Sequence, residues 1–173
     1  SHALAVRGVC VPLALGYFAE NRRRYFLNEY LVDGIHLNDY LSALTDAVTK
    51  RQALKKLALW LRQFHDAGIW QRDFKSNNML FRDGKYFMID LDDVKIRRLS
   101  DRKKIINLAQ LNASVSNVIT LRDRLRFYHY YAADDTPTKH QRREVYRKVW
   151  QISRTKKTDI YDLDLERLWH RDR

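Results

Sequence analysis

The fold of this chain is decided by one stretch, HDAGIWQRDFKSNNMLFRDGKYFMIDLDDV, at residues 65–94. It holds three polar side chains, Asp73, Asn78 and Asp90, and each follows or precedes a short apolar segment. Such segments are typical of short strands, and we expect the polar residues at their edges to face one cleft. The joint spacing D-x4-N-x11-D, with apolar flanks at both ends, favours one polar cluster over a loop with unrelated surface carboxylates.

Phosphoryl transfer needs the residue types that this cluster supplies. One Asp accepts or orients the attacking hydroxyl, while an Asn and a second Asp provide oxygen ligands to a Mg²⁺ that bridges the phosphates. Asp73 would take the first role, and Asn78 and Asp90 the second. Lys75 would neutralise the charge that develops on the transferred phosphate. The cluster therefore indicates phosphoryl transfer assisted by Mg²⁺.

The surrounding pattern predicts an α+β, mainly helical chain. Five glycines and two prolines in 173 residues are too few for the many turns of a β-sandwich or barrel. The clearest helix covers 49–67, with Thr49 as its N-cap and Gly68 at its C-terminal end. The other expected elements are a buried strand at 24–32, a short helix at 37–44, a strand at 69–70, a hairpin of 79–81 and 86–89 around Asp83-Gly84, and helical segments at 105–119, 121–128 (opened by the capping pair Thr120 and Asp123) and 145–152.

Length and composition describe a single folded domain. A hydrophobic content of 45% in 173 residues excludes an intrinsically disordered chain. The single cysteine, Cys10, excludes an internal disulfide framework and a cysteine-built zinc site, and it fits a reducing compartment. The longest apolar run, at 9–19, has 11 residues against the roughly 20 that a bilayer requires. That run is therefore too short to be a transmembrane helix.

The positive charge is concentrated in two segments. The chain has 33 Lys and Arg against 21 Asp and Glu, a net charge of +12. Residues 95–104 contribute +5 and residues 138–157 contribute +7, so the rest of the chain is neutral. Either block alone is most simply a solvated face. Together they favour an anionic partner, which is a membrane surface, a nucleic acid or a phosphorylated glycolipid.

Three segments resemble parts of the protein-kinase-like fold. The run QRDFKSNN at 71–78 is similar to the catalytic loop H-R-D-L-x-x-x-N, and MIDLD at 88–92 is similar to the metal-binding D-F-G segment. The run LNEYL at 27–31 resembles the hinge strand that joins the two lobes. Gln71 replaces the loop's usual His, which we interpret as a scaffold position. Asp92 stands where protein kinases carry Gly, and we expect it to face solvent.

More narrowly, nearly the whole chain resembles the bacterial lipopolysaccharide kinases of the Kdo/WaaP family. The segments that carry the resemblance are RGVCVPLALGYF at 7–18, FLNEYL at 26–31, FHDAGIWQRDFKSNNMLF at 64–81, MIDLDDVKIRRLS at 88–100, NLAQLNAS at 107–114 and LRDRLRFYHYY at 121–131. The resemblance implies ATP-dependent transfer of phosphate to a sugar hydroxyl of the lipopolysaccharide core, as in Kdo and heptose kinases. It also implies a cytoplasmic protein, peripheral at the anionic inner membrane of a Gram-negative bacterium. Its partner would be a core or lipid A-linked sugar, and no DNA partner is expected.

The same resemblance implies the roles of individual residues. Asp73 and Lys75 would be catalytic, and Asn78 and Asp90 would bind Mg²⁺. The hinge backbone would hydrogen-bond the adenine, with Leu80 beneath the base. The residues expected around ATP are Glu29, Tyr30, Leu31, Leu80 and Ile89.

The part of a kinase that precedes the hinge is largely absent from the pattern. No G-x-G-x-x-G loop and no strand lysine paired with a helix glutamate occur before the hinge. We therefore expect 1–35 to be a remnant of the N-lobe with the hinge, and 36–173 to be a C-lobe. Either further sequence precedes Ser1 or the protein is truncated and inactive, so we expect negligible turnover from residues 1–173 alone. Another small-molecule or Rio-like kinase, and a non-catalytic nucleotide-binding or membrane-associated module, stay open as alternatives.

The segment after Asp90 indicates the class of acceptor. Only residues 91–100 separate Asp90 from the next helical pattern, and no A-P-E motif follows. A segment that short cannot form the platform on which a protein kinase binds an extended peptide. Its cations Lys95, Arg97 and Arg98 suit phosphates on an acceptor. We therefore expect these three residues to bind a phosphorylated or acidic sugar lipid.

Overall fold

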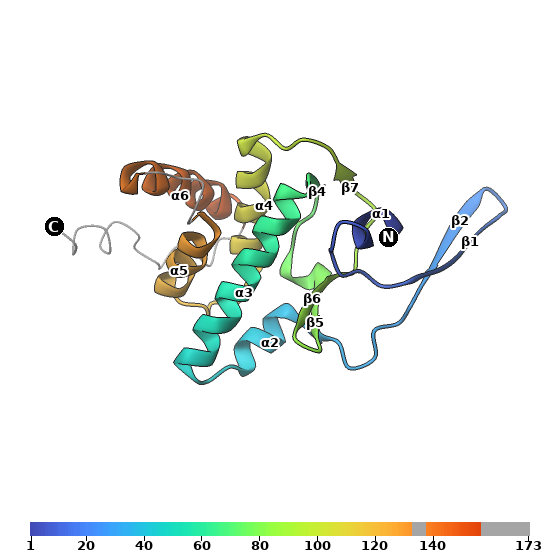
Figure 1. The fold of residues 1–173 in the computed structure, drawn as a ribbon, viewed down its shortest axis with the longest axis horizontal. Helices are drawn as coiled ribbons and strands as arrows, with labels where there is room; N and C mark the ends of the chain where they lie inside the picture. The colour runs from blue at the N-terminus through green and yellow to red at the C-terminus, as the bar shows by residue number, and fades with distance from the viewer. Residues whose placement is uncertain (133–137, 157–173) are drawn as a thin grey trace.

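The chain folds into a mixed α+β structure in which the longer helices lie on one side and the short strands on the other (Figure 1). The computed structural model describes residues 1–132 and 138–156. About half of these residues are helical, so the expected α+β class with a large helical share is confirmed. The elements are α1 (His2–Ala5), β1 (Ala14–Glu20), β2 (Arg23–Asn28), β3 (Ile35–His36), α2 (Leu37–Ala43), α3 (Ala47–Asp66), β4 (Ile69–Gln71), a short 3-10 turn (Ser76–Asn78), β5 (Met79–Arg82), β6 (Lys85–Met88), β7 (Val94–Ile96), α4 (Asp101–Ser114), α5 (Leu121–Ala132) and α6 (Lys139–Arg154).

The strands form three small antiparallel sheets. β1 pairs with β2, β5 lies between β3 and β6, and β4 pairs with β7. The β1–β2 hairpin projects away from the helices (Figure 1), and every residue of β2 is exposed. The prediction of a buried strand at 24–32 is therefore wrong in both burial and length. β2 ends at Asn28, and none of the described elements covers it.

Several local predictions are confirmed because the sequence signals act over short distances. The hairpin of β5 and β6 turns at Asp83 and Gly84, which both have positive φ angles (50° and 76°). The capping pair of α5 forms, with the backbone N–H of Asp123 donating to the Thr120 hydroxyl at 3.3 Å and that hydroxyl donating to the Asp123 carboxylate at 2.7 Å. The expected helix at 37–44 and strand at 69–70 correspond to α2 and β4.

Two helix boundaries differ from the prediction. The N-cap of α3 is Asp46 rather than Thr49, because the Asp46 carboxylate accepts hydrogen bonds from the Thr49 backbone N–H (2.6 Å) and hydroxyl (2.7 Å). These hydrogen bonds lower the pKa of Asp46. The helical segment expected at 105–119 ends at Ser114, since Val115 is extended, with a ψ of 144°. α4 is thus one turn shorter than its apolar spacing indicates.

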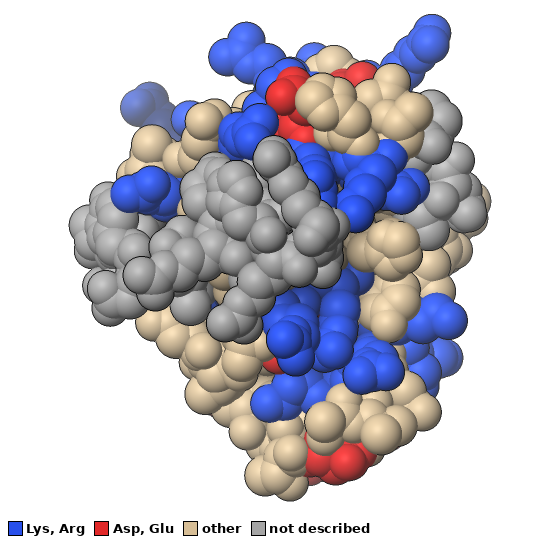
Figure 2. Space-filling model, turned by 90° about the vertical axis from the view of Figure 1, so that its left-hand side faces the viewer, with Lys and Arg blue, Asp and Glu red and all other residues tan. Residues whose placement is uncertain are grey.

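The surface carries an asymmetric charge. Viewed from the side on which α6 lies, the molecule shows Lys and Arg side chains gathered over one face, with few acidic residues between them (Figure 2). Within the described part of the chain, no helix combines the length and the apolar character needed to cross a membrane. The face seen in Figure 2 is therefore a basic surface that includes the +7 segment of the sequence as far as it is described.

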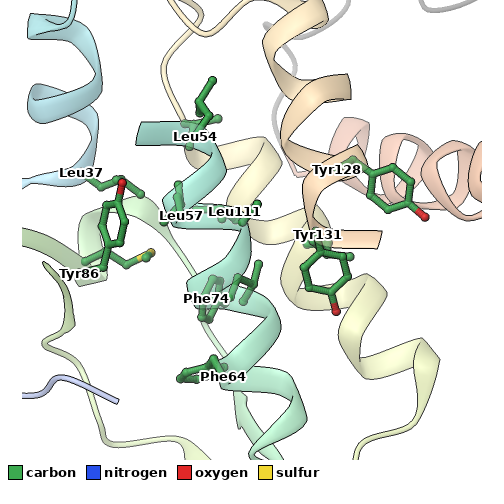
Figure 3. Packing of buried hydrophobic residues seen from close by; sticks show 14 of the residues in the cluster. Leu37, Leu54, Leu57, Phe64, Phe74, Tyr86, Leu111, Tyr128 and Tyr131 are labelled. Atoms are coloured by element: carbon green, nitrogen blue, oxygen red, sulfur yellow. The ribbon is translucent and has the colours of Figure 1, made fainter. Parts of the chain in front are cut away.

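The core is centred on α3. Phe64 of α3 and Phe74, which follows β4, lie close together in Figure 3, and their ring centroids are 5.4 Å apart. Phe74 is fully buried although it belongs to the 71–78 loop, and burying a side chain of this size stabilises a fold by about 1.5–3 kcal/mol. The core therefore anchors this loop directly. The buried face of α3 has the predicted helical spacing and consists of Ala53, Leu54, Leu57, Ala58, Leu61, Phe64 and His65.

His65 is a polar group inside this core. Its Nδ1 lies 2.7 Å from the Tyr131 hydroxyl on α5, and its Nε2 lies 3.4 Å from Oδ1 of Asn107 on α4. The side chain is 2% exposed, and burial lowers the pKa of His65 to about 3. His65 is thus a neutral hydrogen-bonding residue that joins three helices, as expected of a histidine without neighbouring metal ligands.

Gly68 follows the C-terminal end of α3 and lies next to the residue that follows β7, Arg97. It has a φ of +74°, and its carbonyl accepts a hydrogen bond from the backbone N–H of Arg97 at 2.8 Å. A Cβ at this position would lie 2.9 Å from the Arg97 carbonyl oxygen. The predicted glycine at the end of the helix is confirmed, and the close approach of β7 adds a second requirement for it.

We expect Gly68→Ala to lower the free energy of unfolding by about 1–3 kcal/mol from backbone strain alone, and further through the contact with Arg97. The matched control is Gly84→Ala, because Gly84 has a φ of +76° but nothing within 4 Å of an added Cβ. Urea unfolding of both variants measures the difference. Equal losses at the two positions would show that the approach of β7 to Gly68 is not a constraint.

The free energy of unfolding should decrease as the pH is lowered, because His65 is buried in its neutral form. Its pKa is about 3 in the folded protein and about 6.5 when unfolded, so the unfolded chain binds the additional proton. The contribution is complete above pH 6.5 and is lost toward pH 3, at about 1.4 kcal/mol per pH unit between these values. In urea titrations from pH 6.5 to 4.5, His65→Gln should remove this slope, whereas His129→Gln, at an exposed position, should keep it. An unchanged slope in His65→Gln would contradict the assignment.

Candidate active site

The register of the β5–β6 hairpin positions one end of the 71–78 loop. Met79 of β5 pairs with Met88 of β6. The residues just outside this pair are also joined, because the backbone N–H of Ile89 donates to the Asn78 carbonyl at 3.0 Å. The end of the loop is therefore held beside the segment that leaves β6.

Asn78 brings the three predicted polar residues together. Its Nδ2 donates to the Asp73 carbonyl oxygen at 2.9 Å and to Oδ2 of Asp90 at 3.3 Å. The other carboxylate oxygen of Asp90 accepts from the backbone N–H of Asp92 at 3.3 Å, while the Asp92 side chain is exposed, as expected. One amide thus bridges the loop and the segment after β6. Asp73, Asn78 and Asp90 form a single cluster.

Gln71 fixes the peptide that carries Asp90. The Gln71 side chain is 1% exposed, and its Nε2 donates to the Asp90 carbonyl oxygen at 2.9 Å. Its Oε1 accepts from the backbone N–H of Arg72 at 3.2 Å. Both side-chain groups are used to hold backbone, which fits the interpretation of Gln71 as a scaffold residue in place of the loop's usual His.

Lys75 lies next to Asp73 at the surface of the cluster. The Lys75 Nζ is 2.6 Å from Oδ2 of Asp73, and the two side chains are 52% and 46% exposed. An ion pair this exposed gives little net stability, because water solvates both partners. Its chemical consequence is that an ammonium group is held beside the Asp73 carboxylate, where it can contact an incoming anion.

Two buried amides of α4 hold the start of the loop. Asn107 Nδ2 donates to the Gln71 carbonyl oxygen at 2.6 Å, and Gln110 Nε2 donates to the Arg72 carbonyl oxygen at 2.6 Å. Gln110 Oε1 accepts from Asn107 Nδ2 at 3.0 Å and from the Phe74 backbone N–H at 3.4 Å. We call Asn107 and Gln110 the amide clamp. It fixes the peptides on both sides of Asp73.

A second set of contacts holds the middle of the loop. The Ser76 backbone N–H donates to the Ser114 hydroxyl at 2.9 Å, and the Ser76 hydroxyl donates to the Ser114 carbonyl oxygen at 2.7 Å. Asn38 of α2 donates to the Ser76 hydroxyl at 3.0 Å. These supports and the amide clamp were missed in the sequence. The available signal was a pair of amides three residues apart, Asn107 and Gln110, inside an otherwise apolar helical run.

The donor set around Asn78 and Asp90 fits a Mg²⁺. The Asn78 Nδ2 is used as a donor, which leaves its Oδ1 as the atom that can ligate a cation, close to the Asp90 carboxylate. Mg²⁺ is commonly held by one or two protein oxygen ligands, with water and substrate phosphates completing its octahedral shell. In the described part of the chain, no group of three or more His, Cys, Asp or Glu could hold a metal ion by itself.

The expected hinge lies against β5. Oε1 of Glu29 is 3.6 Å from Nη1 of Arg82 in β5. A Cβ at Gly34 would lie 3.0 Å from both the Leu31 carbonyl oxygen and Cδ1 of Leu80, so Gly34 packs closely between these two residues. The structure thus brings Glu29, Leu31 and Leu80 together at β5, the central strand of the β3–β5–β6 sheet.

The other two residues expected around ATP have different surroundings. The Tyr30 side chain is 85% exposed, and its carbonyl accepts from the Val32 backbone N–H at 3.0 Å. Ile89 is half-buried and is bonded to Asn78, next to the Asp90 cluster. Tyr30 is therefore an exposed residue of the expected hinge, whereas Ile89 lies on the metal side of the site.

The structure does not bring the predicted anion-binding residues to Asp73. β7 runs antiparallel to β4, with Val94 opposite Gln71 and Lys95 opposite Trp70. The chain therefore moves away from the cluster along β7 and reaches Gly68 at Arg97. Lys95, Arg97 and Arg98 are exposed along this ladder and beyond its far end. They form a separate basic edge.

A cleft opens on the Asp73 side of the loop. It has a volume of about 450 Å³, which is in the range of small-molecule sites. We call it the loop cleft. Its lining residues are Asp73, Lys75, Asn77, Gln110, Ala113, Ser114 and Lys156. It includes neither Asn78 nor Asp90, so it lies to one side of the metal-ligand pair.

Comparison with known proteins agrees with these motifs. The model of the lipopolysaccharide kinase (Kdo/WaaP) family matches residues 2–131, which include the hinge segment, the 71–78 loop, Asp90 and the amide clamp. No individual curated protein matches the chain significantly. Since the match covers well over half of the 173 residues, the family expected from the sequence is confirmed. The chain belongs to the lipopolysaccharide kinase (Kdo/WaaP) family.

Proposed function

We propose that the protein transfers the γ-phosphate of ATP to a sugar hydroxyl of the lipopolysaccharide core, with Asp73, Lys75, Asn78 and Asp90 at the reacting centre. The observation that carries the proposal is the convergence of the Asn78 amide on both Asp73 and Asp90 in a chain of this kinase family. A loop of surface carboxylates would need neither an amide that bridges two segments nor the buried amide clamp that holds its backbone.

The cluster supports an in-line displacement. The acceptor oxygen forms a bond to the γ-phosphorus, the bond from that phosphorus to the bridging oxygen breaks, and ADP leaves. Asp73 orients the acceptor hydroxyl and takes its proton. Lys75, 2.6 Å from Asp73, stabilises negative charge on the transferred group. Asn78 and Asp90 would hold Mg²⁺, which supplies charge neutralisation of the phosphates when bound.

The nucleotide would lie between the hinge and the β5–β6 hairpin. Glu29 and Leu31 lie close to β5, and Leu80 of that strand is buried, at 9% exposure. Leu80 belongs to β5, which the loop enters directly after Asn78. An adenine packed on Leu80 therefore places its phosphates toward Asn78 and Asp90, since the strand connects the two ends of the site.

The path of the chain after Asp90 favours a small acceptor over a peptide. β7 is paired with β4 along its whole length, from Val94 to Ile96. The edge of β7 that faces β4 is thus already used inside the protein. An extended peptide cannot add to it at that edge, whereas a sugar can reach Asp73 through the loop cleft.

Asp73→Asn in the natural full-length polypeptide should reduce turnover by roughly 10²-fold or more, with the KM for ATP little changed. The amide keeps the shape of the side chain but cannot take the hydroxyl proton. The assay measures transfer of radiolabelled γ-phosphate to lipopolysaccharide core acceptors and, in parallel, to a generic protein substrate. Asp83→Asn, on the exposed hairpin turn, is the matched control and should keep activity. Intact turnover in Asp73→Asn, or faster labelling of the protein substrate, would reject the proposal.

The basic face of Figure 2 suits a peripheral position at the anionic cytoplasmic side of the inner membrane. The acceptor proposed above is attached to lipid, so the enzyme must work close to that surface. α6 supplies exposed cations, among them Lys139 and Lys148. Each Lys or Arg close to an anionic surface contributes about 1 kcal/mol of attraction.

Sedimentation with anionic phosphatidylglycerol vesicles should therefore be strong at low salt and lost near 1 M salt, where the Debye length is about 3 Å. Charge reversal of Lys139, Arg143 and Lys148 to Glu should weaken sedimentation at low salt. The matched control is charge reversal of Arg22, Arg23 and Arg24 at the tip of the projecting hairpin, which changes net charge equally. Equal effects of the two variants would show that net charge, not the α6 face, controls binding.

A further inference from the structure

The loop cleft is built by three parts of the chain that are distant in sequence. The catalytic loop provides Asp73, Lys75 and Asn77, the last turns of α4 provide Gln110, Ala113 and Ser114, and Lys156 follows the end of α6. The cleft reaches the Asp73 carboxylate but not the expected nucleotide residues. It therefore lies where the acceptor, rather than ATP, must approach.

The charges of the lining are unbalanced. Asp73 is the one carboxylate that lines the cleft within the described part of the chain, and it is paired with Lys75 at 2.6 Å. Lys156 is the second cation of the lining. The cleft thus carries a net positive charge, next to the position of the reacting hydroxyl.

The polar groups of the cleft differ in how far contacts among the described residues use them. Gln110 uses both ends of its amide on the clamp and the loop backbone. Ser114 accepts from the Ser76 backbone N–H and donates to the Leu111 carbonyl oxygen at 3.1 Å. Lys156 and Asn77 are exposed side chains of the lining. They are the groups that can bind an acceptor without releasing the loop.

The position of Lys156 is set by a buried contact three residues earlier. Ser153 is fully buried, and its hydroxyl accepts from Nδ2 of Asn112 in α4 at 2.9 Å. The hydroxyl proton is shared between the carbonyl oxygens of Val149 in α6 (2.7 Å) and Ala109 in α4 (3.2 Å). The Lys156 backbone N–H donates to the Ser153 carbonyl oxygen at 3.0 Å. The end of α6 is thereby tied to the same helix that clamps the catalytic loop.

We propose that Lys156 binds an anionic group of the acceptor sugar, a phosphate or a carboxylate, in the loop cleft beside the hydroxyl presented to Asp73. This rests on the proposed function and names the residue that selects its acceptor. An anion between the ammonium groups of Lys156 and Lys75 forms charge-assisted hydrogen bonds to both. Lys156 lines the loop cleft, whereas Lys95, Arg97 and Arg98 do not.

The first test is direct binding. Isothermal titration of the full-length protein with a soluble, delipidated core saccharide that carries phosphate should show an affinity that falls roughly 10- to 100-fold in Lys156→Ala. Lys156→Arg should restore most of it, and Lys85→Ala, at an exposed β6 lysine outside the lining, should leave it unchanged. The same saccharide after phosphatase treatment should bind wild type and Lys156→Ala equally. If Lys156 binds a carboxylate of the saccharide instead, wild type and Lys156→Ala should bind equally only after the carboxylates are esterified.

The second test separates this inference from the proposed function. In the transfer assay, Lys156→Ala should raise the KM for the anionic acceptor and leave the KM for ATP unchanged. If saccharide binding depends on Lys156 but the wild-type protein transfers no phosphate, the proposed function is rejected and the binding site is retained. Equal saccharide binding by Lys156→Ala and wild type would overturn the inference, whatever the activity. An effect of Lys156 that is confined to vesicle-bound acceptor would assign it to lipid headgroups and also overturn it.

Discussion

The site depends on two hydrogen bonds of 2.6 Å, from the buried amides of Asn107 and Gln110 to the carbonyl oxygens of Gln71 and Arg72. A buried carbonyl left without its donor costs about 1–3 kcal/mol, so the loop cannot move away from α4 without that penalty. Phe74, on the other side of Asp73, is fully buried in the core. The carboxylate between these anchors is exposed, yet its backbone has little freedom. Its position is a property of the helical core rather than of the loop.

The same helix organises both sides of the reaction. Through the amide clamp α4 holds the loop from which Asn78 reaches Asp90, and through Ser153 it holds the end of α6 that carries Lys156. The expected metal side and the proposed acceptor side are thus built on one rigid element, which suits a reaction that depends on positioning. Pairing of β7 with β4 completes the arrangement, because it holds the segment after Asp90 along β4, outside the cleft lining.

The sequence predicted the parts of the site whose signals are local. Asp73, Asn78 and Asp90 could be found because short apolar strands and a hairpin turn fix their spacing, and Gly68 because helix ends favour glycine. The amide clamp could not, since its partners are backbone carbonyls 36 and 38 residues away that leave no pattern in side chains. Lys95, Arg97 and Arg98 were expected at the acceptor because cations that follow Asp90 suit phosphates. The strand that directs this segment along β4, β7, has three residues and no visible periodicity. The exposure of β2 was missed because apolar composition indicates burial without saying what covers the strand.

The most direct measurement of the central claim is paramagnetic broadening of backbone amide resonances by Mn²⁺, a hard cation that accepts the same oxygen ligands as Mg²⁺. In the presence of ATP, the amide signals of Asn78, Asp90 and Asp92 should broaden first, and those of Asp83 and Asp46 should stay sharp. Excess Mg²⁺ should reverse the effect. Broadening that is centred on other carboxylates, or that is the same with and without ATP, would contradict a phosphoryl-transfer site at this cluster.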